Sequence, residues 1–172
     1  EQIDIMDAAT KYHEAFDLVF SNAALQWILG HDTLFPKIAG IVKPGGQLAV
    51  QIPHNGWHIG HQLPAIIARE EPFATALEGY VRPRAVLHPV EYALRLKRLG
   101  FEEQTVRLQV YPHLLPSRDA VIDWVRGTML TAYETRLPGP LFERFLAAYR
   151  DRLLAVLPDE RPFFFPFKRI LF

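Results

Sequence analysis

One continuous run constrains the fold more than any other part of this sequence. FDLVFS at 16–21 is an apolar, strand-forming stretch. TLFPKIAGIV at 33–42 places its apolar residues at helical spacing behind Thr33, a predicted N-cap. KPGG at 43–46 predicts a turn, and QLAVQIP at 47–53 predicts a second strand. Because strand, helix, turn and strand form a βαβ crossover, we expect two adjacent parallel strands in an α/β fold.

The remaining segments extend this pattern. Alternation of Ile3 and Ile5 with polar residues predicts a strand at the start, followed by a loop over 8–15. The other predicted elements are short helices and loops at 54–87, a helix at 89–100 ending at Gly100, a strand at 101–113, a helix at 117–130 capped by Ser117, a helix at 140–157 and a strand at 161–172. Pro166 predicts an edge or bulged position in that last strand, whose direction the pattern leaves open.

A chain of 172 residues is long enough for one domain with a substantial core. We expect a single partial domain over 1–172. Its sheet core would comprise 1–53, 89–113 and 161–172, and a helical cap would comprise 54–88 and 114–160. The chain begins at Glu1 and within an apparent strand, so we expect an N-terminal portion to precede it.

Charge and composition exclude several classes of partner. Lysine plus arginine equals aspartate plus glutamate at 19 each, so no overall field favours nucleic acid or an acidic membrane. Cysteine is absent, which excludes disulfides and thiol catalysis. No apolar run reaches the roughly 20 residues that span a bilayer. We therefore expect a soluble, cytoplasmic protein that binds neither nucleic acid nor membrane.

Polar residues follow both strands of the crossover. Ser21 and Asn22 follow the first strand, and His54 and Asn55 follow the second. Ligands of open parallel sheets bind beyond the carboxyl ends of the strands, where Trp27 could cover a flat or sulfur-containing ligand. The alternative is that Asn22 caps a turn and Trp27 belongs to the core.

Three histidines lie close together in the sequence at positions 54, 58 and 61. This spacing suggests a metal site, but Gly56 and Gly60 argue against a rigid presentation of the ligands. We expect no metal. We expect His54 and His61 instead to lie at the rim of the ligand site, as cationic or hydrogen-bonding side chains.

Two arginines of the segment YVRPRAV could bind a carboxylate in a bidentate manner. These are Arg82 and Arg84, and the alternative is a solvated loop. Neither serine lies in a G-x-S-x-G motif, and the chain has no P-loop and no G-x-G-x-x-G, so a serine hydrolase and a glycine-rich phosphate cradle are not expected.

Several motifs together resemble a known family. They are the stretch DAATKYHEAFDLVFSNAALQWILGHDTLFPKIAGIVKPGGQLAVQIPHN, with N-A-x-L-Q-W after its first strand, and the later segments PVEYALRLKRLGF, VYPHLLPSRDAVIDWVRGT and RPFFFPFKRILF. The chain resembles a class I S-adenosylmethionine-dependent methyltransferase, and most of all the trans-aconitate 2-methyltransferase family. The resemblance implies the C-terminal part of a Rossmann-like sheet with helical cap insertions, whose last strand is antiparallel and inserted between its neighbours.

The resemblance also implies cofactor-binding positions. Asp7, followed by Ala8, matches an acidic residue that hydrogen-bonds the adenine amino group. Asn22 and Ala23 match the segment that lines the methionine and sulfonium side of S-adenosyl-L-methionine. The aromatic-bearing motif behind them comprises Leu25, Gln26 and Trp27.

The implied activity is methyl transfer to a small-molecule acceptor, a carboxylate oxygen of trans-aconitate-like type. A carboxylate is already ionised, so this reaction needs no general base. We expect the cap and the helix at 117–130 to close over the acceptor, which would contact His54, Asn55, His61, Arg82 and Arg126.

Two features depart from the family pattern. The glycine-rich loop and the ribose-binding acid would precede Glu1, so we expect the chain alone to be inactive and to associate with itself through an exposed sheet edge. Thr131 stands where the family has an arginine, which leaves a tricarboxylate substrate open. The competing hypotheses are a non-catalytic interaction or structural module and a nicotinamide-dependent Rossmann enzyme.

Overall fold

The structure is a computed structural model that describes residues 2–172. The described chain forms two compact units. Unit 1 contains residues 2–54, 84–110 and 168–172, and unit 2 contains residues 55–83 and 111–167. Each unit has its own hydrophobic core. No helix among the described residues is long and apolar enough to cross a membrane.

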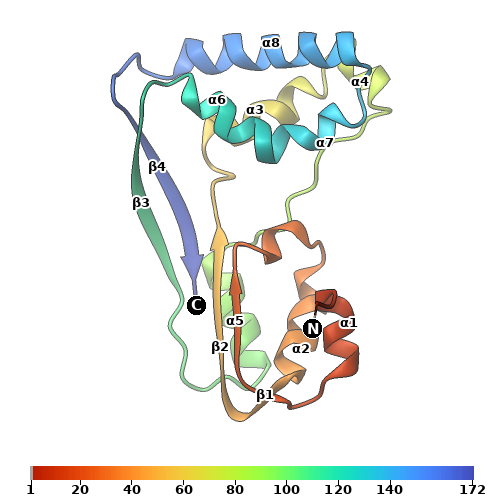
Figure 1. Ribbon diagram of the computed structural model, residues 1–172, viewed down its shortest axis with the longest axis vertical. Helices are drawn as coiled ribbons and strands as arrows, with labels where there is room; N and C mark the ends of the chain where they lie inside the picture. The colour runs from red at the N-terminus through yellow and green to blue at the C-terminus, as the bar shows by residue number, and fades with distance from the viewer. Residues whose placement is uncertain (1) are drawn as a thin grey trace. The chain divides into compact units, whose positions relative to one another are not determined.

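The sheet begins in unit 1 with two parallel strands, β1 (Phe16–Asn22) and β2 (Val42–Pro53), in which Asn22 is opposite Gln51. Strand β4 (Phe163–Leu171) runs antiparallel to β2, and β3 (Arg107–Leu115) follows it in the order β1-β2-β4-β3 (Figure 1). The parallel β1–β2 pair is therefore confirmed. The antiparallel last strand, inserted between its neighbours, is confirmed as well.

The helices of unit 1 pack on one face of its sheet. They are α1 (Ile5–Lys11), α2 (His31–Gly40) and α5 (Pro89–Arg98), with a 3₁₀ turn, η1, at Leu25–Trp27. The core between sheet and helices contains Leu25, Leu34, Phe35, Ile38, Val50, Ile52, Tyr92 and Ile170. Gly100 has φ +88° just beyond α5, as expected for a residue that ends a helix.

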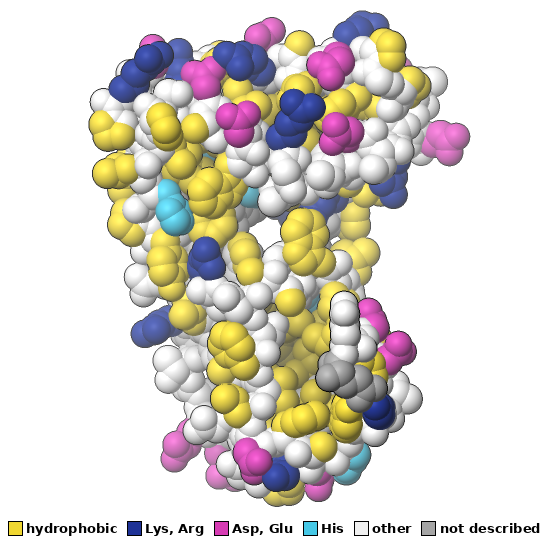
Figure 2. Space-filling view, viewed as in Figure 1, with side chains coloured by type: hydrophobic (Ala, Val, Ile, Leu, Met, Phe, Trp, Pro, Cys, Tyr) yellow, Lys and Arg dark blue, Asp and Glu magenta, His cyan; other side chains and the backbone are white. Residues whose placement is uncertain are grey.

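The opposite face of β1 is apolar and exposed. Phe16, Leu18 and Phe20 alternate along the strand, so they share one face. Their exposed fractions are 38%, 54% and 68%. Figure 2 shows hydrophobic side chains at the surface over the part of unit 1 that contains β1. The described residues of unit 1 thus leave one side of the sheet uncovered.

Unit 2 is mainly helical. Its helices are α3 (Ile59–Ile67), α4 (Phe73–Ala76), α6 (Ala120–Val125), the π-helix η2 (Arg126–Leu130), α7 (Thr131–Glu134) and α8 (Gly139–Val156). Helix α8 buries one stripe comprising Phe142, Phe145, Tyr149 and Leu153. Its outer side carries charges of both signs (Figure 2).

The predicted strand at Ile3 and Ile5 is wrong. Helix α1 begins at Ile5 because the side chain of Asp4 accepts a hydrogen bond from the backbone N–H of Met6 at 2.8 Å. An N-cap of this kind outweighs a short apolar alternation. Glu1, the first residue of the predicted strand, lies outside the described residues.

Three other elements begin at residues that differ from the predicted ones. Helix α2 begins at His31 behind Gly30, so Thr33 lies inside it, and α6 begins after Asp119 instead of at Ser117. The strand predicted at 101–113 begins only at Arg107.

Strand β4 as a whole lies between β2 and β3, whereas the prediction for Pro166 was an edge or bulged position at that point of the strand. The pairing of β4 with β2 ends at Arg169, opposite Pro53. Pro166 therefore lies beyond the paired stretch, where β2 requires no N–H donor from it.

Candidate functional site

The chain turns sharply at the end of β1. Ala23 has φ +51°, a left-handed conformation that costs a non-glycine residue roughly 1–2 kcal/mol. Two hydrogen bonds hold the turn, from the Ala23 N–H to the Gln51 carbonyl at 2.9 Å and from Gln26 Nε2 to the Ala23 carbonyl at 2.6 Å. Strained backbone of this kind is concentrated at functional sites, which makes this turn the first candidate.

A buried hydrogen-bond chain supports the turn from the core. The carbonyl of Leu25 lies 3.0 Å from His31 Nε2, and His31 Nδ1 lies 2.8 Å from the hydroxyl of Tyr92. A carbonyl only accepts, so Nε2 carries the proton and Nδ1 accepts from Tyr92. The Tyr92 oxygen in turn accepts from the Leu87 N–H at 3.2 Å. Burial raises the pKa of Tyr92 to about 12, which keeps its hydroxyl protonated.

Two polar atoms at the turn are buried without a hydrogen-bond partner among residues 2–172. They are Ser21 Oγ and Gln26 Oε1. Buried polar atoms in native proteins are normally paired, so unpaired ones at a strand end fit a site that receives a polar ligand.

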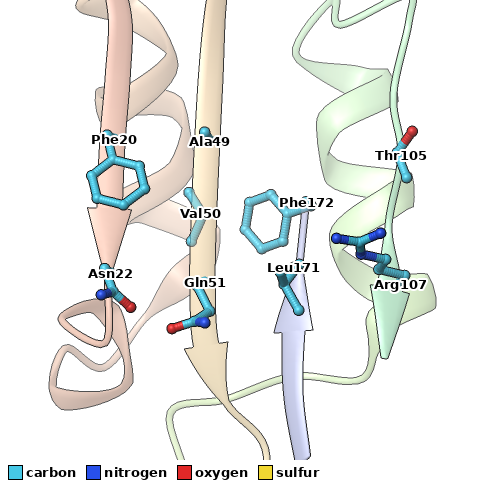
Figure 3. Close-up of a pocket in the computed structure, with 9 residues that line it drawn as sticks. All are labelled: Phe20, Asn22, Ala49, Val50, Gln51, Thr105, Arg107, Leu171 and Phe172. Atoms are coloured by element: carbon cyan, nitrogen blue, oxygen red, sulfur yellow. The ribbon is translucent and has the colours of Figure 1, made fainter. Parts of the chain in front are cut away.

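A pocket of about 460 Å³ opens beside the same strand end (Figure 3). Nine residues of unit 1 line it: Phe20, Asn22, Ala49, Val50, Gln51, Thr105, Arg107, Leu171 and Phe172. Aromatic and aliphatic groups form much of its wall, and four polar side chains reach it. One of these is already engaged, because Gln51 Oε1 accepts from Arg169 at 2.6 Å.

The structure brings together most of the predicted cofactor residues. Asn22, Ala23, Leu25, Gln26 and Trp27 form one continuous turn. The Leu25 side chain is fully buried in the core, so only its main chain is available at the turn, whereas Trp27 is 54% exposed.

The other two predicted cofactor residues lie on α1. Asp7 is exposed in the first turn of that helix, and Ala8 follows it. Helix α1 packs against α2 within unit 1. Asp7 therefore follows a helix N-cap and not a strand.

His54 lies at the end of β2, in unit 1. Its N–H donates to the Lys168 carbonyl at 2.8 Å. Its pKa is lowered, mainly by burial and further by the nearby charges of His88 and Lys168. The neutral imidazole is thus the favoured form, suited to hydrogen bonding more than to a cationic role.

The remaining predicted substrate residues belong to unit 2. The backbone N–H of Arg82 donates to the Tyr133 hydroxyl at 3.2 Å, and its guanidinium lies 3.1 Å from the sulfur of Met129. Arg126 is exposed and lies 3.8 Å from Glu134. Asn55 is buried and His61 is half-buried.

His58, between Asn55 and His61, is the N-cap residue of α3. Its Nδ1 accepts from the Gly60 N–H at 3.1 Å, which caps the helix, and burial lowers its pKa. Residues 2–172 contain no group of three or more metal-ligating side chains.

Sequence reasoning missed several residues near the candidate site. Thr105 and Arg107 line the pocket, and His31 and Tyr92 support the turn. The polar positions of the alternating TVRLQV segment were the only signal for Arg107. His31 and Tyr92 are 61 positions apart in the sequence, and no sequence pattern indicated their contact.

Comparison with known proteins adds a second line of observation. A sequence family described as "Methyltransferase domain" matches residues 2–50. A trans-aconitate 2-methyltransferase of Deinococcus radiodurans is 40% identical over 178 residues, covering 100% of this chain and 66% of its own length. The enzyme of the same name from Streptomyces coelicolor is 40% identical, over 91% of this chain and 53% of its own length.

The chain spans less than two thirds of the length of these curated relatives. Among solved structures, phosphoethanolamine N-methyltransferase 2 of Haemonchus contortus, in complex with S-adenosyl-L-methionine, aligns with a TM-score of 0.40 and 14% identity. It covers 92% of this chain and 33% of the other.

Proposed function

We propose that this chain is part of a class I S-adenosylmethionine-dependent methyltransferase, and that the whole protein transfers a methyl group to a carboxylate oxygen of a small-molecule acceptor. The turn at Asn22–Trp27 carries the proposal. The backbone of Ala23 is strained at this strand end, and the nearby buried atoms Ser21 Oγ and Gln26 Oε1 have no hydrogen-bond partner within residues 2–172. The turn also lies in the motif that resembles the cofactor segment of the family.

The residues of the turn fit the cofactor. Ser21 Oγ and Gln26 Oε1 supply unpaired polar atoms, and Trp27 presents an exposed aromatic face. We assign Asn22, Ala23, Gln26 and Trp27 to the methionine side of the cofactor, with Leu25 through its main chain, and Asp7 with Ala8 to the adenine side. S-Adenosylmethionine supplies a methyl group on a positively charged sulfur.

The proposed reaction requires little acid–base catalysis by the protein. An ionised carboxylate oxygen forms a bond to the methyl carbon while the carbon–sulfur bond breaks, and the electron pair stays on sulfur. The products are a methyl ester and a neutral thioether, and no proton moves. Residues of the site therefore need to align the acceptor and exclude water.

We further propose that the two units have different roles. Unit 1 would hold the cofactor, and unit 2 would supply side chains that bind the acceptor. Within that hypothesis His54, Asn55, His61, Arg82 and Arg126 remain the acceptor-binding residues predicted from sequence. A trans-aconitate-like acceptor is supported by the names of the curated relatives. A cytoplasmic location is part of the same proposal.

A non-catalytic role is the second candidate. The observation in its favour is the exposed apolar face of β1, formed by Phe16, Leu18 and Phe20. Exposed apolar surfaces often mark interaction sites. Absence of cofactor binding would favour this role.

The test is calorimetric titration of the protein, expressed from its complete coding sequence, with S-adenosylhomocysteine. We expect saturable binding. Binding should be at least several-fold weaker in Asn22→Ala, because the ligand loses its polar contact with the Asn22 side chain. Gln47→Ala, an exposed change on β2, is the matched control and should bind as the unmodified protein does. No heat of binding at high micromolar ligand would refute the cofactor assignment.

A further inference from the structure

A histidine of unit 2 carries an unpaired polar atom in the protein interior. The Nε2 atom of His113, on β3, is buried and has no hydrogen-bond partner among residues 2–172. Buried polar atoms of native proteins are normally paired, because an unpaired one loses its hydration without compensation. An imidazole in this state lowers the stability of unit 2, which indicates a role other than packing.

Aromatic rings hold this imidazole in place. The centroid of the His113 ring lies 5.2 Å from that of Trp124 on α6 and 5.7 Å from that of Phe167 on β4. Trp124 also contacts Phe165 and Phe167, with centroids 5.7 and 5.4 Å apart. Strands β3 and β4 are neighbours in the sheet (Figure 1), and all four rings belong to unit 2. The imidazole is therefore fixed in direction, as a group that orients a ligand must be.

The helix that carries Trp124 becomes irregular directly beyond it. Helix α6 ends at Val125 and continues as the π-helix η2. The hydroxyl of Thr128 lies 3.3 Å from the Trp124 carbonyl and 3.2 Å from the Val125 carbonyl. π-Helical turns are rare and occur frequently at functional sites. Two independent irregularities, the unpaired imidazole and the π-helix, thus meet at Trp124.

Trp124 is the neighbour whose movement exposes His113 at the lowest cost. The side chain of Trp124 is only partly buried, whereas Phe165 and Phe167 are buried in the core of unit 2. Displacing the indole therefore removes less apolar surface from the core than displacing either phenylalanine. A ligand that moves the indole aside reaches Nε2.

From this arrangement we infer that His113 binds the methyl acceptor, with the Nε2–H group donating a hydrogen bond to an oxygen of the acceptor once the Trp124 ring has moved aside. This role rests on the proposed function and adds a residue to its acceptor site. The imidazole takes no part in the bond changes. His113 orients the acceptor, and the hydrogen bond satisfies its buried nitrogen.

The experiment uses the protein from its complete coding sequence and trans-aconitate as the probe, titrated with and without S-adenosylhomocysteine. His113→Phe keeps an aromatic ring between its neighbours but removes the donor, so trans-aconitate affinity should fall about tenfold. His113→Gln, whose amide nitrogen replaces Nε2, should recover part of it. S-Adenosylhomocysteine affinity should not change, and KM for trans-aconitate should rise more than kcat falls.

Urea unfolding without ligand separates acceptor binding from a structural role. His113→Phe exchanges a buried unpaired polar atom for an apolar ring, so the unfolding midpoint should stay unchanged or rise. A structural hydrogen bond through His113 would lower it instead. The matched control is His13→Phe, the same change at an exposed histidine of unit 1. It should leave trans-aconitate affinity and the urea midpoint unchanged.

The contrary outcomes are distinguishable. Unchanged trans-aconitate affinity in His113→Phe overturns the role of His113, and so does a lowered midpoint with equal losses of trans-aconitate and S-adenosylhomocysteine affinity. If the unmodified protein binds S-adenosylhomocysteine but not trans-aconitate, the role of His113 falls with this acceptor and the cofactor assignment stands. No binding of S-adenosylhomocysteine refutes the proposed function, and the titration without it still tests His113.

Discussion

Tyr92 joins three segments that are distant in the sequence. Its hydroxyl donates to His31, at the start of α2, and accepts from the Leu87 N–H. Through His31 it also supports the carbonyl of Leu25 in the candidate turn. All these groups lie within unit 1, and the ring of Tyr92 is fully buried. A single hydroxyl thus completes the hydrogen bonding of a buried chain.

We predict that Tyr92→Phe lowers the free energy of unfolding by about 1–3 kcal/mol, because it leaves His31 Nδ1 and the Leu87 N–H unsatisfied in the core. Urea unfolding measures this change. Tyr80→Phe is the matched control, since the Tyr80 ring keeps its contact with Arg136 at 4.0 Å, and it should stay within about 0.5 kcal/mol. Equal effects of the two substitutions would contradict the prediction.

His58 makes the stability of unit 2 depend on pH. Burial lowers the pKa of His58 below the ordinary histidine value of 6.5, so the unfolded chain binds the proton more readily. The stability contributed by neutral His58 is complete above pH 6.5 and is lost as the pH falls through the lower folded-state pKa. Protonation of Nδ1 also removes the acceptor that caps α3.

His58→Asn separates these two effects, because asparagine is a good N-cap and does not titrate. We expect a lower unfolding free energy at all pH values and a shallower loss between about pH 6.5 and pH 5. Urea unfolding at several pH values measures the slope. An unchanged slope would show that other groups cause the acid sensitivity.

At the scale of elements, the first part of β2, where a turn was predicted at residues 43–46, depends on a tight backbone approach at Gly46. A Cβ on Gly46 would lie 2.9 Å from the Lys43 carbonyl oxygen and 3.0 Å from the Asp17 carbonyl oxygen. Neither backbone atom can move without disturbing the pairing of β1 and β2, whose register shifts between Phe16 and Leu18. The glycine is therefore a steric requirement of the crossover.

Gly46→Ala should cost about 1–3 kcal/mol of unfolding free energy through overpacking. Gly40→Ala, at the end of α2, meets nothing within 4 Å and should be neutral or stabilising by up to about 1 kcal/mol. Denaturant unfolding compares the pair. If Gly46→Ala proved as harmless as Gly40→Ala, the steric reading of the crossover would fail.

The elements that sequence predicted well are those with a strong local signal. The apolar runs of β1 and β2 and the Pro89 start of α5 are examples. Helix α1 was mistaken for a strand because two isoleucines outweighed the Asp4 cap, and the π-helix at Arg126–Leu130 has no composition signal. The resemblance located the turn, whereas the pocket gathers residues from four separate stretches that only the folded sheet brings together.

At the scale of the whole molecule, β1 is an edge strand of the described sheet, and one of its faces is apolar. Edge strands and apolar faces both promote association with another copy. The self-association expected from the sequence therefore remains our proposal.

Leu18→Lys tests it by placing a charge on the exposed face of that edge strand. We expect the 172-residue chain to associate as its concentration rises and Leu18→Lys to shift it toward monomer, as measured by sedimentation velocity. Leu94→Lys alters an exposed leucine on α5 and should associate like the unmodified chain. A chain that is monomeric at all concentrations would contradict the proposal.

The chain passes from one unit to the other after His54, Pro83, Val110 and Phe167. Each unit is therefore assembled from separate stretches of the chain. A protease that cuts once between Pro83 and Arg84 would produce two fragments, each holding part of both units. Such a nicked protein should migrate as one particle under native conditions and separate only in denaturant, so the two units cannot be released from each other by a single cut.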